Sequence, residues 1–148
     1  MYHVVVGVDE DESRARACAR AVAGLPGDPA ERRATVVHSF QDNPTGASAP
    51  QLASVRAARR LLEERGVAVT VAESSGDPAA VLLDVAEDEG ADLLVVASRR
   101  RSPAGKALFG STVQAVVRET SLPVLVAGTS GGEDEAGAGD GDGDGAGN

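Results

Sequence analysis

Aromatic residues and cysteine are scarce in this chain, and each shortage restricts the class of protein it can be. Its 148 residues include no Trp, one Tyr and two Phe, so the core must be packed from Val, Leu and Ala rather than around aromatic rings. The single cysteine, Cys18, excludes a disulfide framework within the chain, and its Ala-rich helical surroundings predict a buried thiol. A chain of this length is expected to form one domain.

The chain also lacks a positive balance of charge and any long apolar run. Its formal net charge is −9, and the last twenty residues contribute acids but no base. A surface of net negative charge repels the phosphate backbone, so we expect no binding to nucleic acid. No apolar run of about 18 residues, the length that spans a membrane, is present, and no basic segment precedes an apolar one at the start. We therefore expect a soluble, cytoplasmic protein that does not bind membranes.

Five short runs rich in β-branched residues predict strands. They lie at 2–9, 34–40, 67–73, 92–98 and 123–128. Most are apolar at consecutive positions, which is typical of parallel strands buried on both faces. Four segments with helical spacing lie between them, at 13–24, 49–66, 77–90 and 110–121.

Two of these helices carry clear start signals. Ser13 is expected to cap the first, and Asp77 is expected to cap the third, with Pro78 at its first position. The strict alternation of strand and helix predicts an α/β fold: a doubly wound five-stranded parallel sheet of order 3-2-1-4-5 with helices on both faces.

Residues 1–128 are expected to form this domain. Residues 129–148 contain no apolar side chain larger than that of Ala, so burial cannot offset the entropy lost on ordering them. The sequence therefore predicts a disordered acidic tail rich in Gly and Asp.

Candidate site residues gather where the strand order reverses, at the carboxyl ends of the first and fourth strands. They are Gly7 and Asp9 after the first strand, Ser39 at the end of the second, Ala97, Arg99 and Arg100 after the fourth, and Gly110, Ser111 and Thr112 at the start of the last helix. A helix N-terminus presents free N–H groups and a partial positive charge, which suits an anion. His38 is expected to be a packed strand-end residue. No second His lies at metal-ligand spacing, so no metal site is predicted.

Residues 1–128 resemble a universal stress protein domain. The resemblance rests on a first strand ending in Asp9, a second ending VVHS, the strand DLLVVAS, and the closing stretch GSTVQAVVRETSLPVLV. Members that bind ATP carry the pattern G-x2-G-x9-G-[S/T]. This chain has Ala97, Arg100, Gly110 and Ser111 at that spacing, so two of the three glycines are replaced.

The resemblance implies a role for each matching position. Asp9 would approach the ribose or adenine, and the backbone of Ser39 the adenine. Ala97 and Arg100 would approach phosphates, and Gly110 to Thr112 the triphosphate of ATP, with Mg²⁺ present only together with ATP. Arg100 would be costly where a glycine serves a left-handed turn. The arginines at 99–101 could instead neutralise phosphates through their side chains.

Two functions follow from these residues, and the sequence leaves both open. One is a regulatory module of the stress response that binds ATP or another adenine nucleotide. The other is a dimeric interaction protein with a degenerate ATP motif, in which Gly110 and Ser111 only cap a helix. The apolar strand 123–128 is a predicted sheet edge, and the resembled family pairs it in homodimers.

An enzyme is not expected, beyond slow incidental hydrolysis of ATP. Related folds that activate carboxylates place a Gly/Ser-rich phosphate loop after the first strand, where this chain has acids. A phosphoacceptor receiver needs an Asp at the end of the third strand and a Lys near the end of the fifth, and neither is present.

Overall fold

A computed structural model describes residues 1–41, 46, 48–100 and 108–129. Its elements, in chain order, are β1 (Tyr2–Gly7), α1 (Glu12–Ala23), a 3₁₀ turn η1 (Pro29–Glu31), β2 (Arg32–Phe40), a second turn η2 (Ala49–Gln51), α2 (Ala53–Glu64), β3 (Ala68–Ser75), α3 (Pro78–Asp88), β4 (Leu93–Arg100), α4 (Ser111–Glu119) and β5 (Val124–Thr129).

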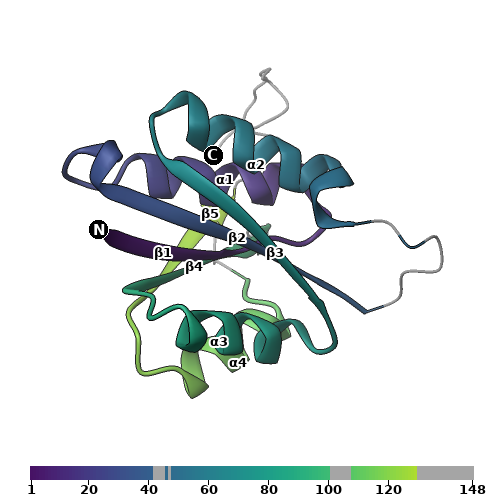
Figure 1. The fold of residues 1–148 in the computed structure, drawn as a ribbon. Coiled ribbons are helices and arrows are strands. Elements are labelled where there is room, and N and C mark those ends of the chain that lie inside the picture. The colour runs from purple at the N-terminus through teal and green to yellow at the C-terminus, as the bar shows by residue number, and fades with distance from the viewer. Residues whose placement is uncertain (42–45, 47, 101–107, 130–148) are drawn as a thin grey trace.

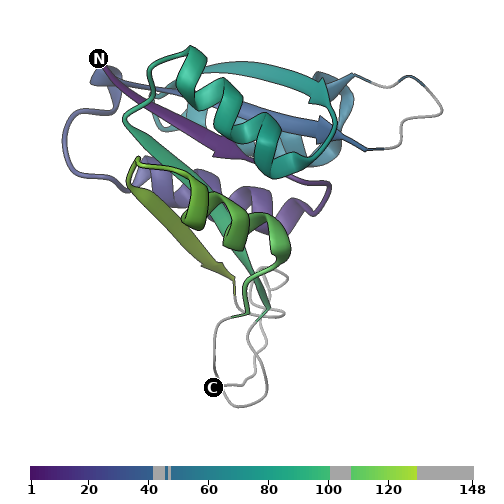
Figure 2. The same cartoon turned by 90° about the horizontal axis from the view of Figure 1, so that it is seen from below.

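The five strands form one sheet in which every neighbouring pair is parallel. Their order is β3-β2-β1-β4-β5, so the chain reverses its direction of winding between β1 and β4. This confirms the predicted fold class and strand order. α1 and α2 cover one face of the sheet and α3 and α4 cover the other (Figures 1 and 2).

The central strand β1 shows why consecutive apolar residues are needed. Val4, Val5 and Val6 have no exposed surface. Because side chains alternate across a strand, Val4 and Val6 pack in the cluster beneath α1 and α2, while Val5 packs in the cluster beneath α3 and α4. Each such burial contributes about 1.5–3 kcal/mol of hydrophobic stabilisation.

The start of α1 corrects one expectation. Asp11, not Ser13, is its N-cap, because the Asp11 side chain accepts a hydrogen bond from the N–H of Arg14. Ser13 lies inside the first turn and donates its hydroxyl to Asp11 Oδ1 (3.0 Å). At α3 the prediction is confirmed: Asp77 caps the helix by accepting from the N–H of Ala80, and Pro78 occupies the first position.

Several element boundaries also differ from those expected. The helix predicted over 49–66 begins with the turn η2, breaks at the extended residue Leu52, and continues as α2. Strand β5 includes Thr129, whose hydroxyl donates to the carbonyl of Ser98 (3.1 Å), so the strand runs one residue into the segment assigned to the tail. The disorder predicted beyond it concerns residues outside those described. Within the described ranges, no helix has the length and apolar character needed to cross a bilayer.

Candidate functional site

A gap opens in the sheet where β1 stops before its neighbours. Gly7, the last residue of β1, is in register with Val37, whereas β2 continues to Phe40. On the other side Val6 is in register with Val95, and β4 continues to Arg100. The strand predicted over 2–9 is therefore two residues shorter, because the chain turns toward α1 after Val8. This early end places the gap at the point where the strand order reverses.

A cavity of about 770 Å³ occupies this end of the sheet. Of the residues singled out from the sequence, its lining contains Gly7, Asp9, Ser39, Ala97, Arg99, Ser111 and Thr112. Residues that are far apart in the chain, Asp9 and the start of α4, thus border one hollow. The volume is in the range of small-molecule sites in proteins.

Asp9 lies at the rim of the cavity with both carboxylate oxygens engaged. Oδ1 accepts from the N–H of Asp11 (2.9 Å), and Oδ2 accepts from Arg14 Nε (3.0 Å) and Nη2 (2.9 Å). Its carbonyl accepts from the hydroxyl of Ser54 on α2 (2.6 Å). The Asp9 side chain is still 56% exposed, so a ligand can reach it while Arg14 holds its orientation.

Ser39 presents its backbone to the gap. The carbonyl of Val37 points toward β1 and accepts from the N–H of Val8 (2.9 Å). Backbone groups alternate in direction along a strand, so those of Ser39 point to the same side, beyond the end of β1. The hydroxyl of Ser39 donates instead to the carbonyl of Gly76 (2.6 Å).

His38 is a packed residue, as predicted. It is 4% exposed, and its ring stands edge-on to that of Phe40 with 4.6 Å between centroids. Its Nδ1 donates to the carbonyl of Val8 (2.8 Å), which fixes the turn leaving β1. The histidine therefore supports the wall of the cavity.

Arg99 lies on the opposite wall and packs against Gly110, which is not itself among the lining residues. The N–H of Arg99 donates to the carbonyl of Leu108 (2.7 Å), so residue 108 pairs antiparallel beside the end of β4. This brings the Arg99 guanidinium onto Gly110: a Cβ on Gly110 would lie only 2.7 Å from Arg99 Nε. Gly110 has φ −73°, a value open to any residue, so the glycine provides space and not an unusual backbone.

Ala97 and Arg100 both lie within β4. Arg100 is in register with Thr129 of β5, after a register shift that follows Ala97. A strand residue has an extended backbone, so the conformational penalty expected for Arg100 in a left-handed turn does not arise at this position. Arg101, the third arginine of the run, lies outside the described residues.

The start of α4 faces the cavity with free backbone donors. Gly110 is its N-cap and has no side chain with which to cap the first turn. The N–H groups of Ser111 and Thr112 therefore have no partner within the helix. Both residues line the cavity, so these donors and two hydroxyls are available there.

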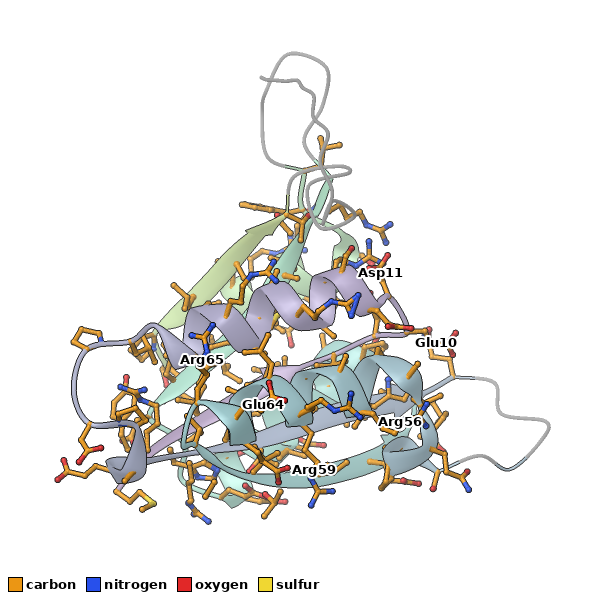
Figure 3. All side chains as sticks on the ribbon, turned by 90° about the horizontal axis from the view of Figure 1, so that it is seen from above. Glu10, Asp11, Arg56, Arg59, Glu64 and Arg65 are labelled. Carbon is orange, nitrogen blue, oxygen red and sulfur yellow. The ribbon has the colours of Figure 1, made fainter. Side chains whose placement is uncertain are left out.

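Acidic residues crowd the rim on the α1 side. Figure 3 shows Glu10 and Asp11 together at the start of α1, with Arg56 on the neighbouring helix α2. The N–H of Arg14 lowers the pKa of Asp11 below its usual value, outweighing the opposing effect of partial burial. Asp11 is thus committed to capping α1.

Gly7 has a packing role that the sequence did not reveal. A Cβ at this position would lie 3.0 Å from Cδ2 of Leu82 on α3. Its missing side chain lets α3 approach the sheet beside the cavity, which Leu82 also lines.

Arg14 is the site residue that sequence reasoning missed. It lines the cavity and binds Asp9, five residues before it in the chain. Its place three residues after the helix-capping Asp11 is a local signal, which the expectation of a cap at Ser13 obscures. Among the described residues, no group of three or more His, Cys, Asp or Glu side chains is arranged to hold a metal ion.

Fold and cavity together define a class: a doubly wound α/β domain with a ligand-sized hollow at the switch point of its sheet and a helix N-terminus on one wall. The model of the universal stress protein family matches residues 1–128. The chain belongs to the universal stress protein family.

Solved structures agree with this assignment. A universal stress protein crystallised in complex with cAMP is 28% identical, with a TM-score of 0.67 over 87% of this chain and 98% of that one. A universal stress protein from Archaeoglobus fulgidus is 24% identical, with a TM-score of 0.64 over 85% of this chain and 98% of that one. Another from that organism, in complex with dAMP, is 20% identical, with a TM-score of 0.60 over 85% of this chain and 97% of that one. The last two share the fold alone as far as this likeness goes. A search of curated proteins gave no significant match.

Proposed function

We propose that the chain is a regulatory module of the stress response that binds an adenine nucleotide in the cavity between the ends of β1 and β4. The observation that carries the proposal is that one hollow joins the Asp9 carboxylate, the outward-facing backbone of Ser39 and the uncapped start of α4. The cAMP complex of the 28% identical relative supports the choice of an adenine nucleotide.

Each part of the ligand has a complementary group. The edge of adenine carries donors and acceptors that match the N–H and C=O of Ser39. Ribose hydroxyls are donors, and Asp9 is an acceptor held in place by Arg14. The phosphate end meets the N–H groups and hydroxyls of Ser111 and Thr112, where the helix dipole favours negative charge. Mg²⁺ would enter only together with ATP. We expect no catalysis beyond slow hydrolysis of ATP.

The direct test is isothermal titration calorimetry with AMP, cAMP and ATP on the wild type and on Asp9→Asn. Asparagine keeps the size of the Asp9 side chain but removes its negative charge. The Asp9 carboxylate is the proposed acceptor for the ribose hydroxyls and the partner of Arg14. Because a hydrogen bond to a charged group contributes about 1.5–3 kcal/mol, we expect affinity to fall by roughly 10- to 100-fold.

Glu63→Gln is the matched control for that substitution. It also removes an exposed ion pair, between Glu63 Oε2 and Arg59 Nε (3.1 Å), but on α2 and outside the cavity lining. It should bind the nucleotide as the wild type does. No heat from any adenine nucleotide with the wild-type protein would contradict the proposal.

A specific observation favours a second candidate, a dimeric interaction protein that does not bind nucleotides. Both oxygens of Asp9 and the hydroxyl of Ser39 already have partners inside the protein. On this alternative Arg14 binds the Asp9 carboxylate where a ligand would otherwise bind it, and the protein acts through contacts of its surface with other proteins.

Under either function we propose a twofold homodimer through β5. This strand lies at the edge of the sheet. The carbonyl of Pro123 bonds inward to the N–H of Leu94, so by alternation the backbone groups of Val124 and Val126 point outward. Such an edge can pair with a second copy.

A further inference from the structure

We infer that Ser54 is a positioning residue for the proposed site: its hydroxyl fixes the turn that carries Asp9, and so supports binding of the ribose hydroxyls of the ligand. The inference rests on the proposed function, because it concerns the same site. It is carried by one hydrogen bond between distant segments, by the burial of Ser54 and by the exposure of the Asp9 carboxylate.

Ser54 places a polar group where its helix otherwise buries apolar ones. It is the second residue of α2, a helix that the structure describes in full, and the buried residues of that helix are Ser54, Val55, Ala58 and Leu62. Ser54 is 1% exposed. A hydroxyl removed from water destabilises the fold unless it is hydrogen-bonded. The bond that this hydroxyl makes, and not apolar packing, therefore explains a serine at this position.

That bond reaches the turn between β1 and α1. The Ser54 hydroxyl donates to the carbonyl of Asp9 (2.6 Å), across a separation of 45 residues in the chain. Figure 3 shows Glu10, next to Asp9 in sequence, and Arg56, two residues after Ser54, at the same end of the neighbouring helices α1 and α2. The contact therefore joins α2 to the turn instead of bracing α2 internally.

The turn is held at successive carbonyls from two different elements. His38 of β2 donates to the carbonyl of Val8 (2.8 Å), and Ser54 of α2 donates to the carbonyl of Asp9. The Asp9 carboxylate, by contrast, is 56% exposed, and its ion pair with Arg14 is open to solvent. Exposed ion pairs constrain side chains weakly because water and salt compete with them. The orientation of the carboxylate therefore depends on the backbone that Ser54 fixes.

A fixed acceptor favours binding of the ligand. When a group must be ordered on binding, the entropy lost reduces the affinity, so a preorganised Asp9 binds hydroxyl donors more tightly than a mobile one. In the proposed site the ribose hydroxyls meet Asp9, while the base and the phosphate have other partners. Loss of the Ser54 hydroxyl should therefore weaken the contribution of the ribose hydroxyls and leave the other contributions unchanged.

The experiment is calorimetric titration of the full chain with AMP and with its dideoxy analogue, which lacks both ribose hydroxyls. The variant is Ser54→Ala, which should keep the helix because Ala has the highest helix propensity. The matched control is Thr129→Val. It also removes a buried hydroxyl that donates to a backbone carbonyl, that of Ser98, but at a position outside the cavity lining. Circular dichroism checks that each variant is folded.

Ser54→Ala should weaken AMP by roughly 2- to 10-fold, the contribution of one neutral hydrogen bond, and leave the dideoxy analogue unchanged. Thr129→Val should keep the wild-type ratio of the two affinities. In the Asp9→Asn background, Ser54→Ala should add little further loss, because both substitutions act through the same side chain.

A second measurement needs no ligand. Backbone amide relaxation measured by NMR gives the order parameter of the Asp9 N–H. It should fall in Ser54→Ala and stay at the wild-type value in Thr129→Val. A loss of global stability alone would change neither this local order parameter nor the ratio of the two affinities.

Each contrary result has a distinct meaning. If Ser54→Ala weakens AMP and the dideoxy analogue equally, or if the order parameter of Asp9 does not change, the inference is overturned while nucleotide binding stands. If AMP does not bind the wild type, the proposed function itself fails and the inference falls with it.

Discussion

At the scale of single residues, burial determines the chemistry of Cys18. Its side chain has no exposed surface and lies in the core cluster between α1 and the sheet. Desolvation, with a smaller contribution from the charge of Asp9, raises the pKa of the thiol from 9.0 to about 12. The residue is therefore a small apolar core group in the folded protein, as the sequence predicted.

This shift predicts how stability changes at alkaline pH. Between pH 9 and about 12 the unfolded chain has lost the thiol proton and the folded protein has kept it. The free energy of unfolding should therefore fall as pH rises through this interval, by at most about 1.4 kcal/mol per pH unit from this group. Urea denaturation at several pH values from 8 upward measures it. Cys18→Ala should lack this component, and equal slopes for the two proteins would contradict the prediction.

At the scale of elements, short polar contacts decide where helices begin. α1 starts at Asp11 because that side chain reaches the N–H of Arg14 (3.0 Å). Ser13, two residues later, satisfies the general preference for a cap but lies within the first turn. The same device begins α3, where Asp77 meets the N–H of Ala80 (3.1 Å).

Removing the cap should therefore be costly only at the residue that provides it. Asp11→Ala should destabilise the protein by about 1 kcal/mol, and Ser13→Ala by a few tenths. The pKa of Asp11 is lowered in the folded protein, so its stabilising effect is present above its usual pKa of 3.8 and is lost as pH falls through its folded value. Chemical denaturation at pH 7 compares the variants. If Ser13→Ala lowered the free energy of unfolding more than Asp11→Ala does, Ser13 and not Asp11 would be the N-cap.

At the scale of the whole molecule, the exposed edge β5 bears on assembly. Val124, Leu125 and Val126 are only half-buried in the single chain. The outward-pointing N–H and C=O groups of Val124 and Val126 can extend the sheet into a second copy related by a twofold axis.

Light scattering coupled to size-exclusion chromatography at micromolar concentration should give the mass of a dimer. Val126→Pro removes an outward-pointing N–H that the sheet of one chain does not use, so the variant should fold and elute as a monomer. Val126→Thr keeps the branched side chain and the N–H and should remain dimeric. Circular dichroism confirms that each variant is folded. A wild-type monomer would rule out the dimer.

The sequence by itself determined the elements and their order. The β-branched runs, the Asp77–Pro78 start of α3 and the alternation of strands with helices are local signals, because they depend on neighbouring residues. Chain-order rules then left one main sheet topology, and the carboxyl ends of its strands located the candidate site.

Only the tertiary structure decided which side chains border the site and which of them contact one another. The approach of Leu82 to Gly7 and the position of Arg99 over Gly110 depend on distances across segments that local patterns do not fix. They follow from where β1 ends relative to β2 and β4, and from residue 108 pairing beside Arg99. Strand register and close packing are cooperative properties of the assembled sheet, so no stretch of sequence carries them alone.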